Sequence, residues 1–381
     1  MAVLSKSFQE WLSGRSCNEL LHPHSCRRAA FENLFRFAWS NSKYYLPVVL
    51  LHLGKHSLRS GGANQEILLD TLWYYAQLVF GGVVDASLIS ISMCSLRNFL
   101  GKFHLYTLLF IPATIGGAFC ALFPKRVKHL QHTAIFQALI ESLLLHLNPL
   151  SKLLASSLSL QTAIFMICSA VILEGQQRRW YNGFWFLTPD APKDPENPSP
   201  SKSCTHLELD CGLYIVRGIR NYLLVGLALD VFRYLVSSSK LNQWNLSHLN
   251  FQSTAWLGCY VGLYRAVHCY LRRIPIIDES LKHPLAGFLG GLSYLFYPKL
   301  TILSYALLEA IRSLSPKKHK PRKYSKIRFG WSDVLFPLSL AYLIHNYVME
   351  GQRVSALSGV IIDSTTANYA RNIGKRIARL Q

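Results

Sequence analysis

Two short segments of the chain place cysteines beside histidines, the side chains that bind transition metals and form disulfides. The first segment reads CNELLHPHSC and the second reads CTHLELDC. Their thiols and imidazoles are Cys17, His22, His24 and Cys26 in the first segment, and Cys204, His206 and Cys211 in the second. Ligands from both segments could complete a four-ligand metal site if the fold brought the two segments together.

Neither segment has the C-x2-C spacing that makes a zinc site recognisable from sequence alone. Three interpretations therefore stay open: a metal site, a disulfide, or thiols near the membrane that do no chemistry. The sequence predicts no metal centre, and the weak candidates for one are Cys17, Cys26, Cys204 and Cys211. The other five cysteines lie within apolar blocks, where we expect inert packing residues: Cys94, Cys120, Cys168, Cys259 and Cys269.

Catalytic motifs are missing from the sequence. It contains no G-x-S-x-G, no H-E-x-x-H and no phosphate-binding loop with its lysine. We predict that the protein is not an enzyme and that it has no catalytic residue and no cofactor.

Two glutamates, Glu141 and Glu309, stand within apolar blocks. An ionisable side chain in a membrane is costly and usually has a partner or a function. A structural ion pair between helices is the favoured interpretation. The available partners are Arg97 in the first half of the chain, and Arg265, Arg272 or Arg273 in the second. The alternatives are a polar cavity for a substrate, or helices on the membrane surface whose acids reach water.

The elements that carry these side chains are predicted to be membrane helices. Half of the residues are hydrophobic and 16% are charged, against about 25% charged in soluble domains. Phe103–Phe123 and Leu153–Leu173 contain no charged residue, and Thr71–Leu96 contains only Asp85. A helix of about 20 such residues crosses the hydrocarbon core. We predict an all-α, polytopic membrane protein with eight to ten membrane helices, and we disfavour a soluble protein with buried helices.

The net charge of +20 comes from basic residues at the edges of the apolar blocks. The densest basic run is PKKHKPRKYSKIR, in a loop at residues 315–328. Such loops follow the positive-inside rule or bind anionic lipid headgroups. The residues predicted to meet the headgroups are Lys317, Lys318, Lys320, Arg322 and Lys323. Nucleic acid is disfavoured as a partner because no nucleic-acid module flanks the run.

The chain repeats itself. GGAFCALFPK from Gly116 returns as GGLSYLFYPK from Gly290, ALIE returns as ALLE, and EGQQR returns as EGQR, in the same order. A proline-rich stretch, residues 188–203, lies between the copies and is typical of a linker. We predict two internally repeated helical bundles, residues 1–187 and 204–381, whose relative orientation depends on the number of helices in each.

Small residues recur in these apolar segments, where they let helix backbones approach closely. The predicted packing glycines are Gly116, Gly117, Gly258, Gly262, Gly287, Gly290 and Gly291. Ordinary packing is the simplest interpretation, and a groove or partner interface is the alternative.

Four segments resemble the transmembrane protein 135 family. They are MAVLSKS with HPHSCR near the N terminus, FQSTAWLGCYVGLYRAVHCYLRRI, DESLKHPLAGFLGGLSYLFYPKLT, and VMEGQ. The likeness is strongest between Phe251 and Glu309. That family resembles the channel subunits of the mitochondrial inner-membrane translocase. The motif that they share matches Arg273, Asp278, Ala286, Gly287 and Gly291 here, with slightly longer spacing.

The resemblance implies a multi-pass protein of peroxisomal and mitochondrial membranes. It implies a non-enzymatic role in the balance of mitochondrial fission and fusion, with a dynamin-related fission GTPase and membrane lipids as partners. It also implies a role in peroxisome organisation and lipid metabolism. Three function classes remain: a regulatory scaffold, which we rank first, a carrier of fatty acids, sterols or metabolites, and a translocase-like channel.

Overall fold

The structure is a computed structural model, and it describes most of the chain. The described residues are 6–60, 65–146, 149–187, 189, 210–241, 250–314 and 330–380. All regular elements among them are helices, which confirms the predicted all-α class for this part of the chain. The basic loop with its five predicted headgroup residues, and nearly all of the predicted linker, lie outside the described residues.

The chain forms two compact units. Unit 1 consists of Met1–Leu147 and Lys323–Gln381, and unit 2 consists of Asn148–Arg322. These units differ from the two predicted halves, because residues 148–187 belong to unit 2 and the C-terminal part belongs to unit 1. The first half of the sequence therefore contributes α8 and α9 (residues 149–177) to unit 2, and the second half contributes α14, η5, α15 and α16 (residues 331–380) to unit 1.

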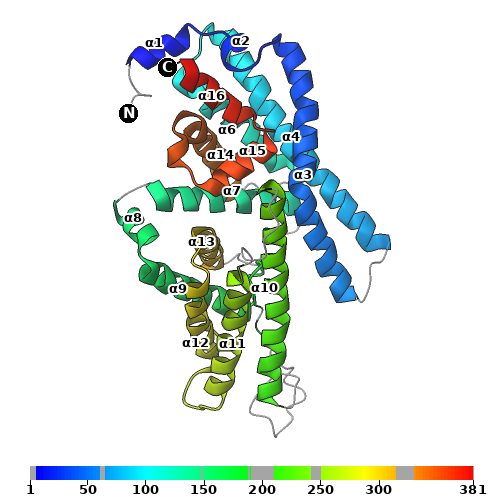
Figure 1. The fold of residues 1–381 in the computed structure, drawn as a ribbon, viewed down its shortest axis with the longest axis vertical. Helices are drawn as coiled ribbons and strands as arrows, with labels where there is room; N and C mark the ends of the chain where they lie inside the picture. Colours follow the sequence, from blue (N-terminus) through cyan, green and yellow to red (C-terminus); the bar gives the residue numbers. More distant parts are fainter. Residues whose placement is uncertain are drawn as a thin grey trace. The chain divides into compact units, whose positions relative to one another are not determined.

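Unit 1 is built around two long helices, α3 and α4, that pack against each other along their length (Figure 1). A short helix, α6, packs against both α4 and α14. The helices of the N-terminal part are α1 (Lys6–Ser13), α2 (Cys17–Leu20), α3 (Cys26–Ser60), α4 (Gln65–Leu100), α5 (Leu105–Leu108), α6 (Phe110–Ala118), η2 (Phe119–Leu122) and α7 (Lys125–His146). The C-terminal part adds α14 (Trp331–Met349), η5 (Gly351–Arg353), α15 (Ala356–Thr365) and α16 (Tyr369–Leu380).

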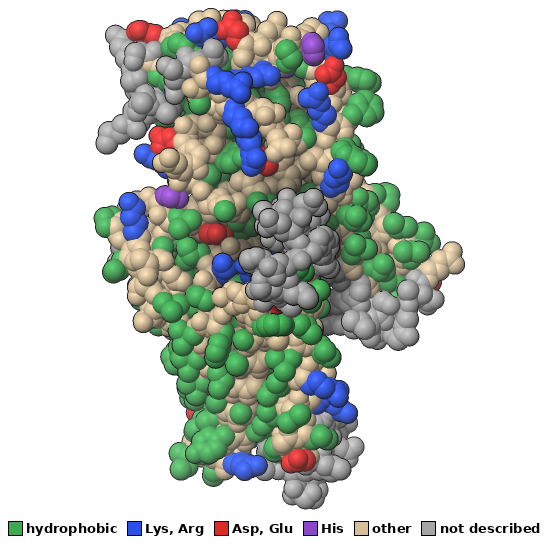
Figure 2. Space-filling view, viewed as in Figure 1, with side chains coloured by type: hydrophobic (Ala, Val, Ile, Leu, Met, Phe, Trp, Pro, Cys, Tyr) green, Lys and Arg blue, Asp and Glu red, His purple; other side chains and the backbone are tan. Residues whose placement is uncertain are grey.

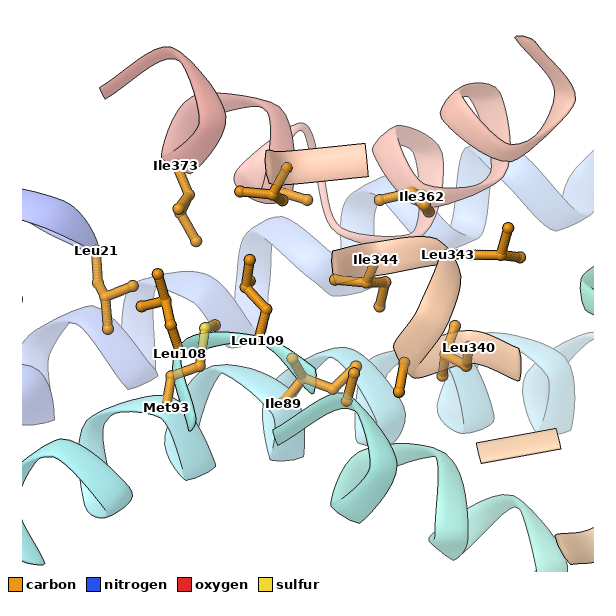
Figure 3. Close-up of a cluster of buried hydrophobic side chains, with 14 of the residues drawn as sticks. Leu21, Ile89, Met93, Leu108, Leu109, Leu340, Leu343, Ile344, Ile362 and Ile373 are labelled. Atoms are coloured by element: carbon orange, nitrogen blue, oxygen red, sulfur yellow. The ribbon is translucent and has the colours of Figure 1, made fainter. Parts of the chain in front are cut away.

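The core of unit 1 joins helices from both ends of the chain. Figure 3 shows Ile89 on α4, Leu340 and Ile344 on α14, and Ile362 on α15 turned toward a common interior. All four side chains are buried. These apolar side chains are close-packed, and their packing holds α14 and α15 against the N-terminal helices.

Unit 2 is also built from packed helices. Its helices are α8 (Pro149–Ser156), α9 (Leu158–Gln177), α10 (Cys211–Leu241), α11 (Gln252–Arg272), α12 (Glu279–Gly290), η4 (Gly291–Phe296) and α13 (Leu300–Leu314). Helix α10 packs against α11, and α12 packs against both α11 and α9. The core between them is aromatic, with Phe165 stacked on Tyr294 at a ring distance of 5.0 Å and Trp185 beside Tyr260.

Three of the described helices are long and apolar enough to cross a membrane: Gln65–Leu100, Leu158–Gln177 and Cys211–Val231. This is fewer than the eight to ten that we predicted. The block Phe103–Phe123 is not one spanning helix, because it is divided among α5, α6 and η2. The block Leu153–Leu173 is divided at Ser157, whose hydroxyl accepts a hydrogen bond from the Leu160 amide and caps α9.

Large apolar side chains cover the outside of several helices. In unit 2, Figure 2 shows hydrophobic side chains over much of the visible face of α11 and α12. On α10, Leu213, Val216 and Leu224 are each more than half exposed. Contiguous exposed apolar surface of this kind marks contact with lipid or with another protein.

Candidate functional site

Unit 1 contains an apolar cavity beneath its core residues. Its volume is about 90 Å³, and it lies among α3, α4, α7, α14 and α15. Ile89, Leu340, Ile344 and Ile362, seen in Figure 3, form part of its wall. Its walls are mostly apolar, as in ligand pockets, but its volume is below the roughly 300–1,000 Å³ of pockets that hold drug-sized molecules.

A single carboxyl group faces this cavity. Asp85, in the middle of α4, is only 9% exposed. Its Oδ2 accepts a hydrogen bond from Gln131 Nε2 at 3.3 Å, and the other end of Gln131 accepts one from the Cys120 thiol at 2.9 Å. Oδ1 of Asp85 is buried and has no hydrogen-bond partner in the described part of the chain. A buried carboxyl oxygen left in this state costs about 1–3 kcal/mol or more.

The cavity therefore combines apolar walls with one polar atom that needs a partner. A ligand with an apolar body and one hydroxyl group matches this chemistry, and the cavity of about 90 Å³ would have to widen to admit a long one. The sequence offered a signal for this site, because Asp85 is the only charged residue in the block Thr71–Leu96. We had placed functional charge at Glu141 and Glu309 instead.

Glu309 is buried in unit 2, but its partners are not the predicted ones. It is 1% exposed, its Oε1 accepts from Arg312 Nη1 at 2.6 Å, and its Oε2 accepts from the Tyr181 hydroxyl. Burial and the neighbouring Glu309 raise the pKa of Tyr181, which keeps the phenol protonated as a donor. Arg312 lies one helical turn after Glu309 on α13, a spacing at which the side chains of a helix meet.

The predicted partners of Glu309 are occupied elsewhere. Arg265 lies over the Tyr214 ring at 4.0 Å and donates to the Tyr214 carbonyl, and Arg272 pairs with Glu279 at 3.3 Å. Arg273 is exposed at the end of α11, and so is Asp278 just before α12. In the first half, Glu141 is buried on α7, and its ion pair with Arg97 stays a prediction.

The predicted small residues lie at helix contacts in each unit. A Cβ on Gly116 would come within 2.5 Å of Ile89 on α4, and one on Gly117 within 3.0 Å of the Pro337 backbone on α14. The others meet neighbouring helices in unit 2. A Cβ would approach Leu223 at Gly258, Ile219 at Gly262, Leu173 at Gly287, Tyr260 at Gly290 and Met166 at Gly291, and Ala286 is fully buried.

Three of the cysteines and one histidine come together in unit 1. The Sγ atoms of Cys17, Cys26 and Cys94 and a ring nitrogen of His22 lie within 4.8 Å of one another. Cys94 had been predicted to be an inert packing residue, and the fold places it in this cluster. Cys211, by contrast, begins α10 in unit 2, and Cys204 lies outside the described residues.

An ion pair fixes the start of α14 to α7 and gives a testable prediction. Asp333 accepts from Lys128 Nζ at 2.9 Å and from the Gly330 amide at 2.9 Å. Burial alone would raise its pKa, but the Gly330 amide and Lys128 outweigh burial, so the pKa of Asp333 lies below its ordinary 3.8. We expect Asp333→Asn to lower the free energy of unfolding by about 1–3 kcal/mol at neutral pH.

Since the folded-state pKa is depressed, this contribution is present above pH 3.8 and is lost as pH falls through the lower folded value. Unfolding of the purified protein in detergent, measured from pH 7 down to pH 3, should show the wild type and Asp333→Asn converging at the acid end. A constant difference at every pH would contradict the assignment.

No protein-family model matches the chain, and no solved structure matches it.

Proposed function

We propose that this is a multi-pass membrane protein that binds an amphipathic lipid with a hydroxyl headgroup in the cavity of unit 1. The observation that carries the proposal is Asp85, which lines an apolar cavity and whose buried Oδ1 has no hydrogen-bond partner among the described residues. A lipid hydroxyl would supply that hydrogen bond, and the wall side chains would have to move apart for the apolar body, because the cavity holds only about 90 Å³.

The chemistry favours a hydroxyl over a carboxylate. A fatty acid would bring a second carboxyl group against Asp85, and two carboxyl groups at one site cannot both ionise. A sterol or long-chain alcohol brings a group that both donates and accepts. Among the ligands that the sequence suggested, the site therefore fits a sterol better than a fatty acid.

Three helices of spanning length and the exposed apolar side chains of α10 to α12 support the multi-pass arrangement. Such surfaces are stable when lipid surrounds them. The cavity of unit 1 would then receive its ligand from the membrane. The cavity is the feature of the described structure that favours a carrier.

The test is binding of a radiolabelled sterol to the purified full chain in detergent. Replacing Asp85 with Leu removes the carboxyl group while keeping the branching of the side chain, and we expect affinity for the sterol to fall by about 10- to 100-fold. Asp85→Asn, which keeps a hydrogen-bond acceptor, should lower the affinity for the sterol by less. A fatty acid of similar length should compete poorly.

Asp70→Asn is the matched control, because Asp70 is another carboxylate of α4 and pairs with Arg126 at the surface. It should bind sterol as the wild type does. Equal affinity of the wild type and Asp85→Leu for the sterol would contradict the proposal. Failure of the folded wild type to bind any hydroxyl lipid would contradict it too.

We also propose that the two halves are copies of one helical unit that exchange their last helices. In both halves a helix that ends near a Gly-Gly pair continues as a 3-10 turn, and Pro-Lys then opens the next helix, α7 or α13. Helix α6 packs against α14 in unit 1, and α12 packs against α9 in unit 2. α9 ends within the EGQQR sequence, and α14 ends directly before the EGQR sequence.

For the cellular role we propose regulation of mitochondrial fission and fusion and of peroxisome lipid metabolism, at the membranes of both organelles. The resemblance of residues 251–301 to the transmembrane protein 135 family supports this role. A dynamin-related GTPase is the proposed partner on the same ground. A lipid-binding cavity is consistent with a protein that couples membrane composition to organelle shape.

A further inference from the structure

The cysteine and histidine cluster of unit 1 comes from three separate elements. Cys17 opens α2, Cys26 opens α3, and His22 lies in the turn between them. Cys94 comes from the distant end of α4, 68 positions after Cys26. Because the four ligand atoms lie within 4.8 Å of one another, a small rearrangement would bring them to the spacing of a tetrahedral metal site.

The ring of His22 is oriented for a metal. Its Nδ1 donates to the His24 carbonyl, so the lone pair is on Nε2, which lies 3.3 Å from the Cys94 sulfur. Metal-binding histidines usually have this second contact, because it fixes the tautomer and the direction of the ring. His22 is only 4% exposed, so its contact with the sulfurs is not a chance surface approach.

The surroundings also suit an anionic centre. Three thiolates and one divalent cation leave a net charge of −1, which needs a positive neighbour when it is buried. Arg97 lies one turn after Cys94 on α4, close enough for its charge to act on Cys17. Its Nε is buried and has no hydrogen-bond partner in the described part of the chain.

We propose that Cys17, His22, Cys26 and Cys94 bind one Zn²⁺ ion in a tetrahedral Cys3His site. All four positions are filled by protein, which is typical of structural zinc and leaves no open position for catalysis. Binding displaces the three thiol protons to solvent. The inference goes beyond the proposed lipid binding and does not depend on it.

Such an ion would fix the N-terminal segment to the end of α4. The core of unit 1 also holds this segment, because Leu12 on α1 and Leu20 on α2 are fully buried in it. Leu21, directly before His22, points toward Leu108 and Met93 in Figure 3 and belongs to the same core. The ion and this core contact would together determine where α1 and α2 lie.

The first measurement is the metal content of the purified full chain, kept reduced and free of chelators. We expect one zinc per chain by elemental analysis. After removal of zinc, titration with Co²⁺ should give the intense visible absorption of tetrahedral cobalt with a thiolate charge-transfer band. Modifying the thiols with a mercurial should release the zinc.

The variants are Cys94→Ser, Cys26→Ser and His22→Gln. Each should lower zinc affinity by more than the roughly 10- to 100-fold that loss of an outer contact causes. Cys120→Ser is the matched control, since Cys120 is buried in the same unit and its thiol donates to Gln131, which a hydroxyl can also do. It should keep one zinc per chain.

Three results would count against the zinc site. A folded wild type that takes up neither zinc nor cobalt overturns the proposal. Iron with acid-labile sulfide in place of zinc would mean a cluster and would overturn it too. Zinc that remains equally tight in Cys94→Ser and in Cys120→Ser would show binding elsewhere. If a variant fails to fold, the wild-type cobalt spectrum still decides the question.

Discussion

Replacing Glu309 with Leu is expected to lower the free energy of unfolding by about 3–5 kcal/mol, because it breaks a buried pair from one side. Glu309 holds Arg312 at 2.6 Å with one oxygen and the Tyr181 hydroxyl with the other. Leucine would leave both groups facing an apolar side chain in a dense aromatic core. Thermal unfolding in detergent, followed by tryptophan fluorescence, measures the change.

A milder substitution and a surface control make this result specific. Glu309→Gln keeps an acceptor for the Tyr181 hydroxyl and should lower the free energy of unfolding by less, about 1.5–3 kcal/mol. Glu174→Gln removes the partner of Arg178 in an exposed ion pair of the same unit, at 2.7 Å, and should change stability by less than about 1 kcal/mol. If Glu309→Leu were as stable as Glu174→Gln, the buried network would not contribute as we describe.

The second large effect is expected at Gly291, where η4 lies against α9. A Cβ at this position would come within 2.7 Å of the Met166 Cα, so the two backbones would have to move apart. Overpacking of this kind typically costs about 1–3 kcal/mol of stability. We expect Gly291→Val to cost at least the upper value, because the added side chain meets backbone atoms rather than a side chain that can rotate away. Loss of folded protein in gel filtration and a lower unfolding midpoint are the readouts.

Two other glycines provide a graded comparison. At Gly290 the nearest atom to an added Cβ is the Tyr260 carbonyl oxygen at 3.3 Å, and at Gly351 nothing lies within 4 Å. Alanine should therefore be harmful at Gly291, mild at Gly290, and within about 0.5 kcal/mol of wild type at Gly351. Equal effects at the three positions would contradict the packing described for α12, η4 and α9.

The sequence was sufficient to predict the all-helical class, because long apolar stretches with almost no charge have few other structures available. It did not predict the helix breaks. Hydropathy alone treats Phe103–Phe123 as one segment, whereas the chain turns at His104, at Leu109 and again after Ala118. Those breaks depend on packing of α6 against α4 and α14, which are distant in sequence.

The same limit applies to the candidate sites. Glu309 was predicted to be buried and paired, but its partner Arg312 belongs to its own helix, and Tyr181 follows α9 more than 100 positions earlier. Three of the four proposed zinc ligands, Cys17, His22 and Cys26, lie in one short segment, and Cys17 and Cys26 were among the weak candidates predicted from the sequence. The sequence around Cys94 does not identify it as a ligand, because only the antiparallel pairing of α3 and α4 brings it to that segment.

The central claim is that a hydroxyl lipid lies inside unit 1 with its headgroup at Asp85. The most direct test is to label the purified chain with a photoactivatable sterol and to locate the adduct by mass spectrometry. We predict adducts on cavity residues of α4, α14 and α15, around Ile89, Leu340 and Ile362, which excess sterol abolishes and Asp85→Leu greatly weakens. Adducts confined to the exposed side chains of α10 to α12, or adducts that Asp85→Leu leaves unchanged, would contradict it.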